Sequence, residues 1–172
     1  GKVVLEKPFG ENLTAAKALN EKMENFFHPD NIYRIDHYLG KEMVRNIQTI
    51  RFANPIFSGV WDAEHIECIQ ISALEEVGVE TRGGYYDHSG AMKDMVQNHL
   101  FQILSIVAME QPGELMLAGE EMHREQIRVL SALHTPEKIE ESLVLGQYKG
   151  YREENAVAED SMTESYAALK VF

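Results

Sequence analysis

AMKDMVQNHLFQILSIVAME, residues 91–110, predicts the longest helix of this 172-residue chain. Its second half is apolar on nearly every side, and a helix with that pattern is usually buried. The first half carries Asp94, Asn98 and His99. We therefore expect the helix to run through the core, with polar side chains at one end.

Around this helix, the pattern of apolar residues predicts a mixture of helices and strands. Helical spacing recurs in three further stretches, residues 11–27, 39–52 and 120–133. Alternating or β-branched runs predict strands at residues 2–6, 65–75, 142–149 and 166–172. Three glycines predict a loop over residues 83–90, and residues 151–164 form a polar stretch expected to be mobile. After residue 60 there is no βαβ regularity, so we expect an α+β fold with a mainly antiparallel sheet.

The composition restricts the classes of function. The net charge is −12 at pH 7, which argues against binding to nucleic acids or anionic membranes, because both need a basic surface. No apolar run is long enough to span a bilayer, and no signal-peptide pattern opens the sequence. The single cysteine, Cys68, excludes an intramolecular disulfide and favours a reducing, cytoplasmic location. Both ends fall within strand-like runs, so we expect a piece of a longer protein.

His99 is the first candidate for chemistry. A histidine in a buried helix must have its ring nitrogens paired. A backbone carbonyl would satisfy a purely structural histidine, whereas a general base would have a carboxylate behind the ring. Asp94 lies five positions earlier, about 140° round a regular α-helix. The two side chains should then flank a site, and any carboxylate partner of His99 should come from elsewhere in the sequence.

The stretch RIDHYLGKE, residues 34–42, gathers a carboxylate, an imidazole, a phenol and an ammonium group. If a helix begins near residue 37, then His37, Tyr38 and Lys41 crowd its first turn. Helix N-termini favour anions, so a lysine there is unusual unless a phosphate binds. The alternative is that Asp36 is an ordinary N-cap with incidental neighbours. The misplaced cation favours an anion site.

Two further polar residues lie at the ends of expected strands. Lys7 follows the strand at residues 2–6, where α/β sheets place ligand contacts, although a surface lysine in a turn is the simpler interpretation. Glu75 continues the apolar face of Ile71 and Ala73, unless it lies just beyond the strand in solvent. No histidine or cysteine spacing resembles a metal site.

Seven stretches occur in the order in which glucose-6-phosphate dehydrogenases carry them. They span residues 3 to about 148 and read VVLEKPFG, IYRIDHYLGKE, RFANPIF, RGGYYD, DMVQNHLFQIL, VAMEQP and VLGQY. DHYLGKE together with QNHL is highly specific, whereas EKP is shared with a broader set of sugar oxidoreductases. The chain therefore resembles this family over most of its length.

This resemblance implies a fold and a reaction. Residues 1–35 would be the C-terminal end of a Rossmann-type α/β coenzyme domain. Residues 36–172 would begin an α+β domain for substrate binding and oligomerisation, built on a large, mainly antiparallel sheet packed with helices. The reaction would be the oxidation of glucose 6-phosphate to 6-phosphoglucono-1,5-lactone, the first step of the pentose phosphate pathway. The hydride acceptor would be NADP, with NAD as the alternative.

The resemblance also assigns residues by their matching positions. His99 matches the general base that takes the proton of the sugar C1 hydroxyl, and Asp36 matches its carboxylate partner. Three residues match those that grip the 6-phosphate: His37, Tyr38 and Lys41. Glu75 and Asp94 match acidic residues that hold sugar hydroxyls, although Glu76 stands where the family often has proline. Lys7 matches a lysine near the reacting end of the sugar, and Lys7 with Pro8, which is cis in the family, would also contact the coenzyme.

Some family features lie outside this sequence. The glycine-rich nucleotide fingerprint is absent, and so is a substrate lysine that the family has well beyond Phe172. We therefore expect the isolated chain to be inactive and the complete enzyme to be a homodimer or homotetramer. Two other functions remain open: another NAD(P)-dependent sugar dehydrogenase that prefers the unphosphorylated sugar, and a non-catalytic assembly module.

Overall fold

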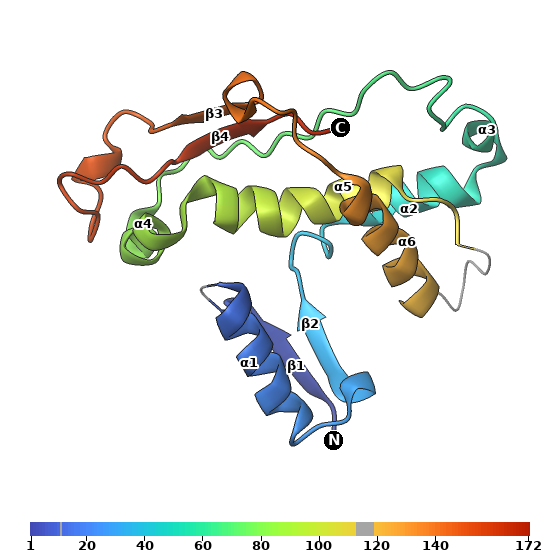
Figure 1. The fold of residues 1–172 in the computed structure, drawn as a ribbon, viewed down its shortest axis with the longest axis horizontal. Helices are drawn as coiled ribbons and strands as arrows, with labels where there is room; N and C mark the ends of the chain where they lie inside the picture. The colour runs from blue at the N-terminus through green and yellow to red at the C-terminus, as the bar shows by residue number, and fades with distance from the viewer. Residues whose placement is uncertain (11, 113–118) are drawn as a thin grey trace. The chain divides into compact units, whose positions relative to one another are not determined.

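The computed structural model describes residues 1–10, 12–112 and 119–172. The chain forms two compact units, Gly1–Lys41 and Glu42–Phe172 (Figure 1). Each unit has its own arrangement of helices and strands.

The first unit is a parallel pair of strands joined by a helix. Its elements are β1 (Val3–Glu6), α1 (Leu13–Glu24), a 3₁₀ turn (Pro29–Asn31) and β2 (Ile32–Ile35). The strand at the start of the chain and the body of the expected helix are confirmed, while Glu11 lies outside the described residues. The sequence did not lead us to expect β2. The two strands pair in parallel from Val3 with Ile32 to Glu6 with Ile35, which a crossover helix such as α1 makes possible.

The second unit is mostly helical. Its longer helices are α2 (Glu42–Ala53), α4 (Gly83–Ala91), α5 (Phe101–Ala108) and α6 (Gly119–Ala132). A π-helical segment, Met92–Leu100, runs directly into α5. The short elements are α3 (Pro55–Ser58) and 3₁₀ turns at Glu80–Arg82, Ile139–Glu141 and Tyr151–Glu153. No helix in the described part of the chain is both long and apolar enough to cross a membrane.

The helix expected over residues 91–110 is confirmed as a continuous rod from Met92 to Ala108. None of its apolar residues from Leu100 to Val107 is exposed, as the all-round apolar pattern predicts. Its C-terminal end is capped by Arg51, whose guanidinium donates to the carbonyl oxygens of Ile106 and Met109 at 2.9 and 2.8 Å. A positive charge at the C-terminal end of a helix also interacts favourably with the helix dipole.

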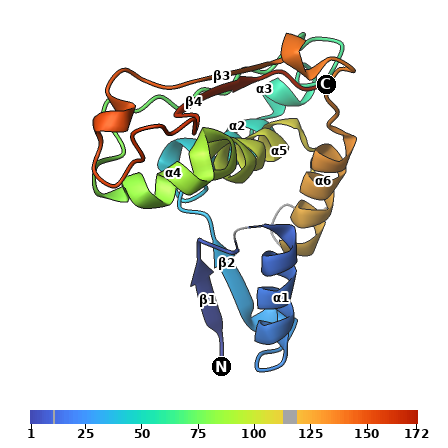
Figure 2. The same ribbon diagram turned by 60° about the vertical axis from the view of Figure 1, so that its left-hand side comes forward.

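A two-stranded antiparallel ribbon lies along this helix. It consists of β3 (Leu143–Gly146) and β4 (Tyr166–Leu169), paired from Leu143 with Leu169 to Gly146 with Tyr166 (Figures 1 and 2). Both strands were expected, and the α+β class with antiparallel pairing is confirmed. Each sheet within the described residues has two strands. The large sheet that we expected is therefore not seen among these residues, where the antiparallel pairing is limited to the β3–β4 ribbon.

The strand expected over residues 65–75 is not formed. These residues run beside the β3–β4 ribbon as an extended segment, but they join no ladder (Figures 1 and 2). Alternation in a sequence shows which side chains share a face, whereas a strand also needs a neighbour for its backbone groups. From Ile71 to Leu74 the side chains alternate between half-buried and exposed without any pairing, whereas Ile69 is exposed.

The loop expected over residues 83–90 is the helix α4. Gly83 allows close packing, because a Cβ at this position would collide with the main-chain oxygen of Asn155. Only Gly90 departs from helical geometry, with φ +70° and ψ 173°, and it separates α4 from the π-helical segment.

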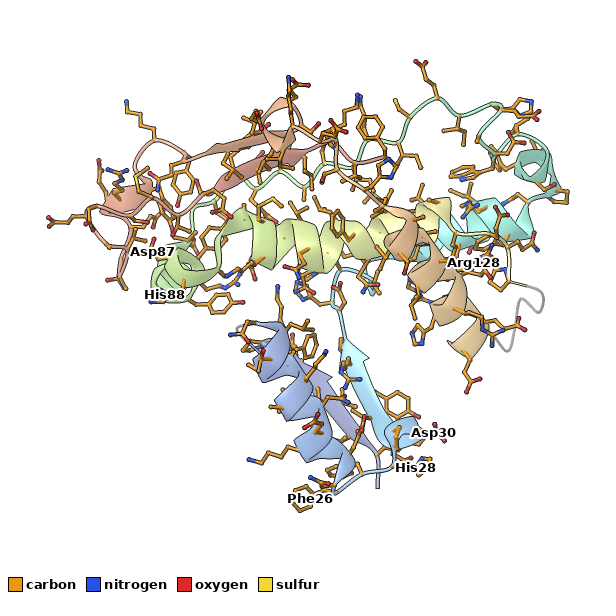
Figure 3. All side chains as sticks on the ribbon, in the orientation of Figure 1. Phe26, His28, Asp30, Asp87, His88 and Arg128 are labelled. Carbon is orange, nitrogen blue, oxygen red and sulfur yellow. The ribbon has the colours of Figure 1, made fainter. Side chains whose placement is uncertain are left out.

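The stretch over residues 151–164, expected to be mobile, is held on α4 by Asp87 (Figure 3). The carboxylate of Asp87 accepts hydrogen bonds from the Tyr151 and Ser161 hydroxyls and from the Ala158 amide, and its carbonyl accepts one from Thr163. Tyr151 is fully buried against Tyr86, with ring centroids 6.3 Å apart. These contacts show that a polar stretch was mistaken for a mobile one.

Candidate functional site

In the first unit, candidate residues gather at the carboxyl ends of two parallel strands. Glu6 pairs with Ile35, so Lys7 and Asp36 are the next residues along neighbouring strands. The peptide bond between Lys7 and Pro8 is cis, as the resemblance led us to expect. Parallel sheets bind ligands at this edge, where the loops leave the strands. The unexpected strand β2 is therefore what brings Lys7 close in register to Asp36.

The RIDHYLGKE stretch forms a tight turn between β2 and α2. Asp36 Oδ1 accepts a hydrogen bond from the Tyr38 amide at 2.8 Å, and the Asp36 carbonyl accepts one from Leu39 at 3.1 Å. The helix begins only at Glu42, so the expectation of a start near residue 37 is wrong. Short acidic side chains stabilise such turns by bonding the backbone two residues on. Asp36 therefore caps the turn, and the helix-start argument for an anion does not apply to it.

In this turn the Tyr38 ring contacts the side chains of both His37 and Lys41. The Lys41 ammonium lies 3.7 Å from the centroid of the Tyr38 ring, and the His37 ring meets the same ring edge-on at 5.1 Å between centroids. Tyr38 is buried, while His37 and Lys41 are exposed. The buried Tyr38 ring thus contacts the exposed side chains of His37 and Lys41, both of which carry nitrogen donors. A phosphate is bound by a group of donors of this kind through charge-assisted hydrogen bonds.

In the second unit, Asp94 and His99 lie on the π-helical segment, with exposed fractions of 2% and 1%. In a π-helix each amide bonds the carbonyl five residues back, as Phe101 does to Val96 at the end of this segment. Two residues that are five positions apart therefore lie about one turn apart along this segment. The expected angle of 140° assumed a regular α-helix and is wrong here, because the wider winding puts both side chains on the same side of the helix.

The carboxylate of Asp94 is held from two directions by residues that the sequence did not single out. Arg82 donates to Oδ2 at 3.1 Å, and the Tyr85 hydroxyl donates to Oδ1 at 3.3 Å. Burial, followed by the negative charge of Asp94, raises the pKa of Tyr85 above its ordinary value. The RGGYYD motif contains both residues, but their distance from Asp94 in the sequence does not predict these contacts. The contacts depend on the change of chain direction at Gly90.

Glu75 is exposed in the extended segment that follows residue 65. It lies outside the paired strands of the described residues. The assigned roles of all these residues, including His99 as the base with Asp36 as its partner, stay predictions. The same holds for Lys7 and Pro8 as coenzyme contacts and for the domain boundary after residue 35.

Two family models cover the chain. Residues 48–172 match the model described as glucose-6-phosphate dehydrogenase, C-terminal domain, and residues 1–46 match the model described as glucose-6-phosphate dehydrogenase, NAD binding domain. The chain belongs to the glucose-6-phosphate dehydrogenase family. The resemblance drawn from the seven sequence stretches is thereby confirmed.

Similar proteins of this family are known from several bacteria. Glucose-6-phosphate 1-dehydrogenases of Borreliella burgdorferi and Bacillus subtilis are 47% and 46% identical to this chain, over 99% of its length in each case. The matches cover 38% and 37% of those two proteins, so the chain spans little more than a third of the relatives' length.

Solved structures of the family have the same fold. The crystal structure of glucose-6-phosphate 1-dehydrogenase from Mycobacterium avium is 41% identical, with a TM-score of 0.88 over 99% of this chain and 37% of that one. A second is described as glucose-6-phosphate dehydrogenase in complex with its substrate glucose-6-phosphate. It is 37% identical, with a TM-score of 0.87 over 99% of this chain and 36% of that one.

Proposed function

We propose that these residues form part of an enzyme of the relatives' length, called here the intact enzyme, that oxidises glucose 6-phosphate to 6-phosphoglucono-1,5-lactone. The observation that carries the proposal is the turn at residues 36–41, where Tyr38 anchors His37 and Lys41 at a parallel strand edge. Family membership supports it, as does the similar structure that is described with glucose 6-phosphate bound.

In this proposal the substrate's two ends are bound by different groups. His37, Tyr38 and Lys41 hold the 6-phosphate, and Lys41 contributes a full positive charge. Asp94 accepts a hydrogen bond from a sugar hydroxyl, and Glu75 has the same assignment by resemblance. Lys7 lies beside this turn in strand register, which suits a contact at the reacting end of the sugar.

The chemical step is a proton transfer coupled to a hydride transfer. His99 removes the proton from the C1 hydroxyl, and the C1 hydrogen leaves with its electron pair, so that C1 becomes the lactone carbonyl. The nicotinamide of NADP, when bound, supplies the hydride acceptor. Burial of His99 fits this role, because it keeps bulk water from the base. Asp36 would hold the imidazole and stabilise its protonated form.

The residues of the first unit fit the last part of a coenzyme site. Its parallel strands and crossover helix are the construction used by dinucleotide-binding domains, and Lys7 and Pro8 lie at the edge where such domains bind. We also propose that the coenzyme is NADP rather than NAD. The intact enzyme would be a homodimer or a homotetramer, located in the cytoplasm.

The first experiment is a nicotinamide-reduction assay of the intact enzyme with glucose 6-phosphate or glucose as substrate, and with NADP or NAD as acceptor. Activity restricted to the phosphate ester would support the proposal. Activity with plain glucose would favour a broader sugar dehydrogenase, and inactivity with both sugars would favour the assembly module.

Lys41→Ala tests the phosphate site in the same assay. Removal of one charge-assisted bond should raise the KM for glucose 6-phosphate by about tenfold or more, while kcat changes little, because the bond is present in ground and transition states alike. Lys138→Ala is the control, since Lys138 is an exposed lysine with Glu141 as its ion-pair partner at 3.5 Å. An unchanged KM in Lys41→Ala would remove Lys41 from the phosphate site.

A further inference from the structure

Arg82 reaches a buried carboxylate from a largely exposed position. Its guanidinium nitrogen lies 3.1 Å from Oδ2 of Asp94, and the exposed fractions of the two side chains are 57% and 2%. A buried carboxylate is costly unless a cation and hydrogen bonds compensate for the lost water. Arg82 therefore supplies a charge that the environment of Asp94 requires.

The position of Arg82 is set by its own surroundings. It ends the 3₁₀ turn Glu80–Arg82, where its amide donates to the Val79 carbonyl at 2.9 Å. The next residue, Gly83, packs against the main chain of Asn155 with no room for a side chain. The guanidinium also lies over the Tyr85 ring, 5.4 Å from its centroid. The backbone and this ring together aim the side chain at Asp94.

The two donors restrict the rotation of the carboxylate. Arg82 bonds Oδ2 and the Tyr85 hydroxyl bonds Oδ1, so both oxygens of Asp94 are held from α4 and the turn before it. A sugar hydroxyl can therefore donate to an oxygen whose direction has been set in advance, which lowers the entropic cost of binding.

We propose that Arg82 is a positioning residue for substrate recognition: it holds the Asp94 carboxylate in a fixed orientation, so that Asp94 accepts a hydrogen bond from a sugar hydroxyl. Tyr85 assists by bonding the other oxygen. This inference rests on the proposed function, in which Asp94 binds the sugar. It assigns a role to the RGGYYD motif beyond forming α4.

A merely structural ion pair would behave differently. If Arg82 served only to tie α4 to the π-helical segment, its loss would lower the unfolding temperature and affect sugar and coenzyme alike. A positioning residue affects the sugar selectively, and a lysine, which restores the charge without the planar fork, recovers part of the loss.

The test is made in the intact enzyme with Arg82→Gln, Arg82→Lys and Tyr85→Phe. Arg82→Gln should raise the KM for glucose 6-phosphate by roughly ten- to a hundredfold, with the KM for the coenzyme and the unfolding temperature nearly unchanged. Arg82→Lys should fall between Arg82→Gln and the unsubstituted enzyme. Tyr85→Phe, which keeps the ring, should raise the same KM by about two- to tenfold.

Arg128→Gln is the matched control. Arg128 lies on α6 (Figure 3), is 68% exposed and pairs with Glu125 at 2.9 Å. The same substitution there should leave both KM values unchanged.

An unchanged KM for glucose 6-phosphate in Arg82→Gln would overturn the inference. So would equal effects on the sugar and the coenzyme, or a lysine variant no better than glutamine. If Arg82→Gln fails to fold, the lysine and phenylalanine variants decide by the same KM comparison. Absence of activity with glucose 6-phosphate in the unsubstituted enzyme would instead refute the proposed function, and this inference with it.

Discussion

Gly90 connects α4 to the helix that carries Asp94 and His99, and its replacement by alanine should be strongly destabilising. Its φ of +70° and ψ of 173° fall in a region that is essentially restricted to glycine. A Cβ at this position would lie 2.6 Å from Cδ of Glu164. Glu164 caps the start of the helix that begins at Met92. Its carboxylate accepts a hydrogen bond from the Met92 amide at 3.0 Å, and its carbonyl oxygen accepts one from the Ala91 amide at 2.9 Å.

The size of the effect follows from two contributions. Backbone strain in this region costs about 1–3 kcal/mol for a residue with a side chain. The Glu164 side chain must also move away, which removes its bond to Met92 and costs about 1.5–3 kcal/mol for an amide bonded to a charged group. Together they lower the free energy of unfolding by roughly 2.5–6 kcal/mol. For a domain of this size that corresponds to a fall of about 10 °C in unfolding temperature.

Thermal unfolding of the intact enzyme measures this prediction. Gly59→Ala is the control, because Gly59 has a negative φ of −93° and no atom within 4 Å of the added Cβ. Its unfolding temperature should stay within a degree or two of the unsubstituted enzyme. A Gly90→Ala enzyme as stable as the Gly59→Ala enzyme would refute the reasoning.

The double substitution Gly90→Ala with Glu164→Ala separates the two contributions. Both single substitutions remove the bond to Met92, so their effects should not add. We expect the double variant to be about as stable as Gly90→Ala alone. Full additivity of the two losses would show that the Cβ at position 90 does not displace Glu164.

Two further predictions concern ionisable groups. His99→Asn in the intact enzyme should lower kcat by roughly 10⁴-fold with substrate affinity largely kept, as measured by steady-state kinetics, and a small effect would exclude His99 as the base. Asp87→Asn should cost about 1 kcal/mol of unfolding free energy at neutral pH, since an amide cannot accept all the hydrogen bonds that the carboxylate accepts. Hydrogen bonding, first from Ser161, lowers the pKa of Asp87, so this stabilisation is complete above the unfolded pKa of about 3.9 and disappears as the pH falls through the folded value. Unfolding midpoints of the two proteins should therefore converge in acid, and a difference that grows there would contradict the assignment.

Much of the helical structure could be predicted because apolar spacing directly records burial. The helix over residues 91–110 is the clearest case, and its buried second half follows from composition alone. The polar stretch over residues 151–164 shows the limit of the same argument. Its polar side chains bond to Asp87 rather than to water, and no pattern within the stretch identifies a partner so distant in sequence.

Strand pairing was the least predictable part. Residues 65–75 alternate as a strand does, yet no neighbour pairs with them within the described residues, whereas β2 showed too little pattern to be noticed and is paired. A ladder depends on a second segment of backbone, and the alternation of one segment says nothing about its partner.

By itself, the sequence determined the family, most of the longer helices and the identity of the candidate groups, because local spacing and motif order record which residue types are present and which faces are apolar. The tertiary structure decided how those groups are presented. Parallel pairing of β1 with β2 puts Lys7 in register beside Asp36. The π winding and the turn at Gly90 bring Arg82 to Asp94, since a change in helical period and a single positive φ redirect side chains without changing any apolar pattern.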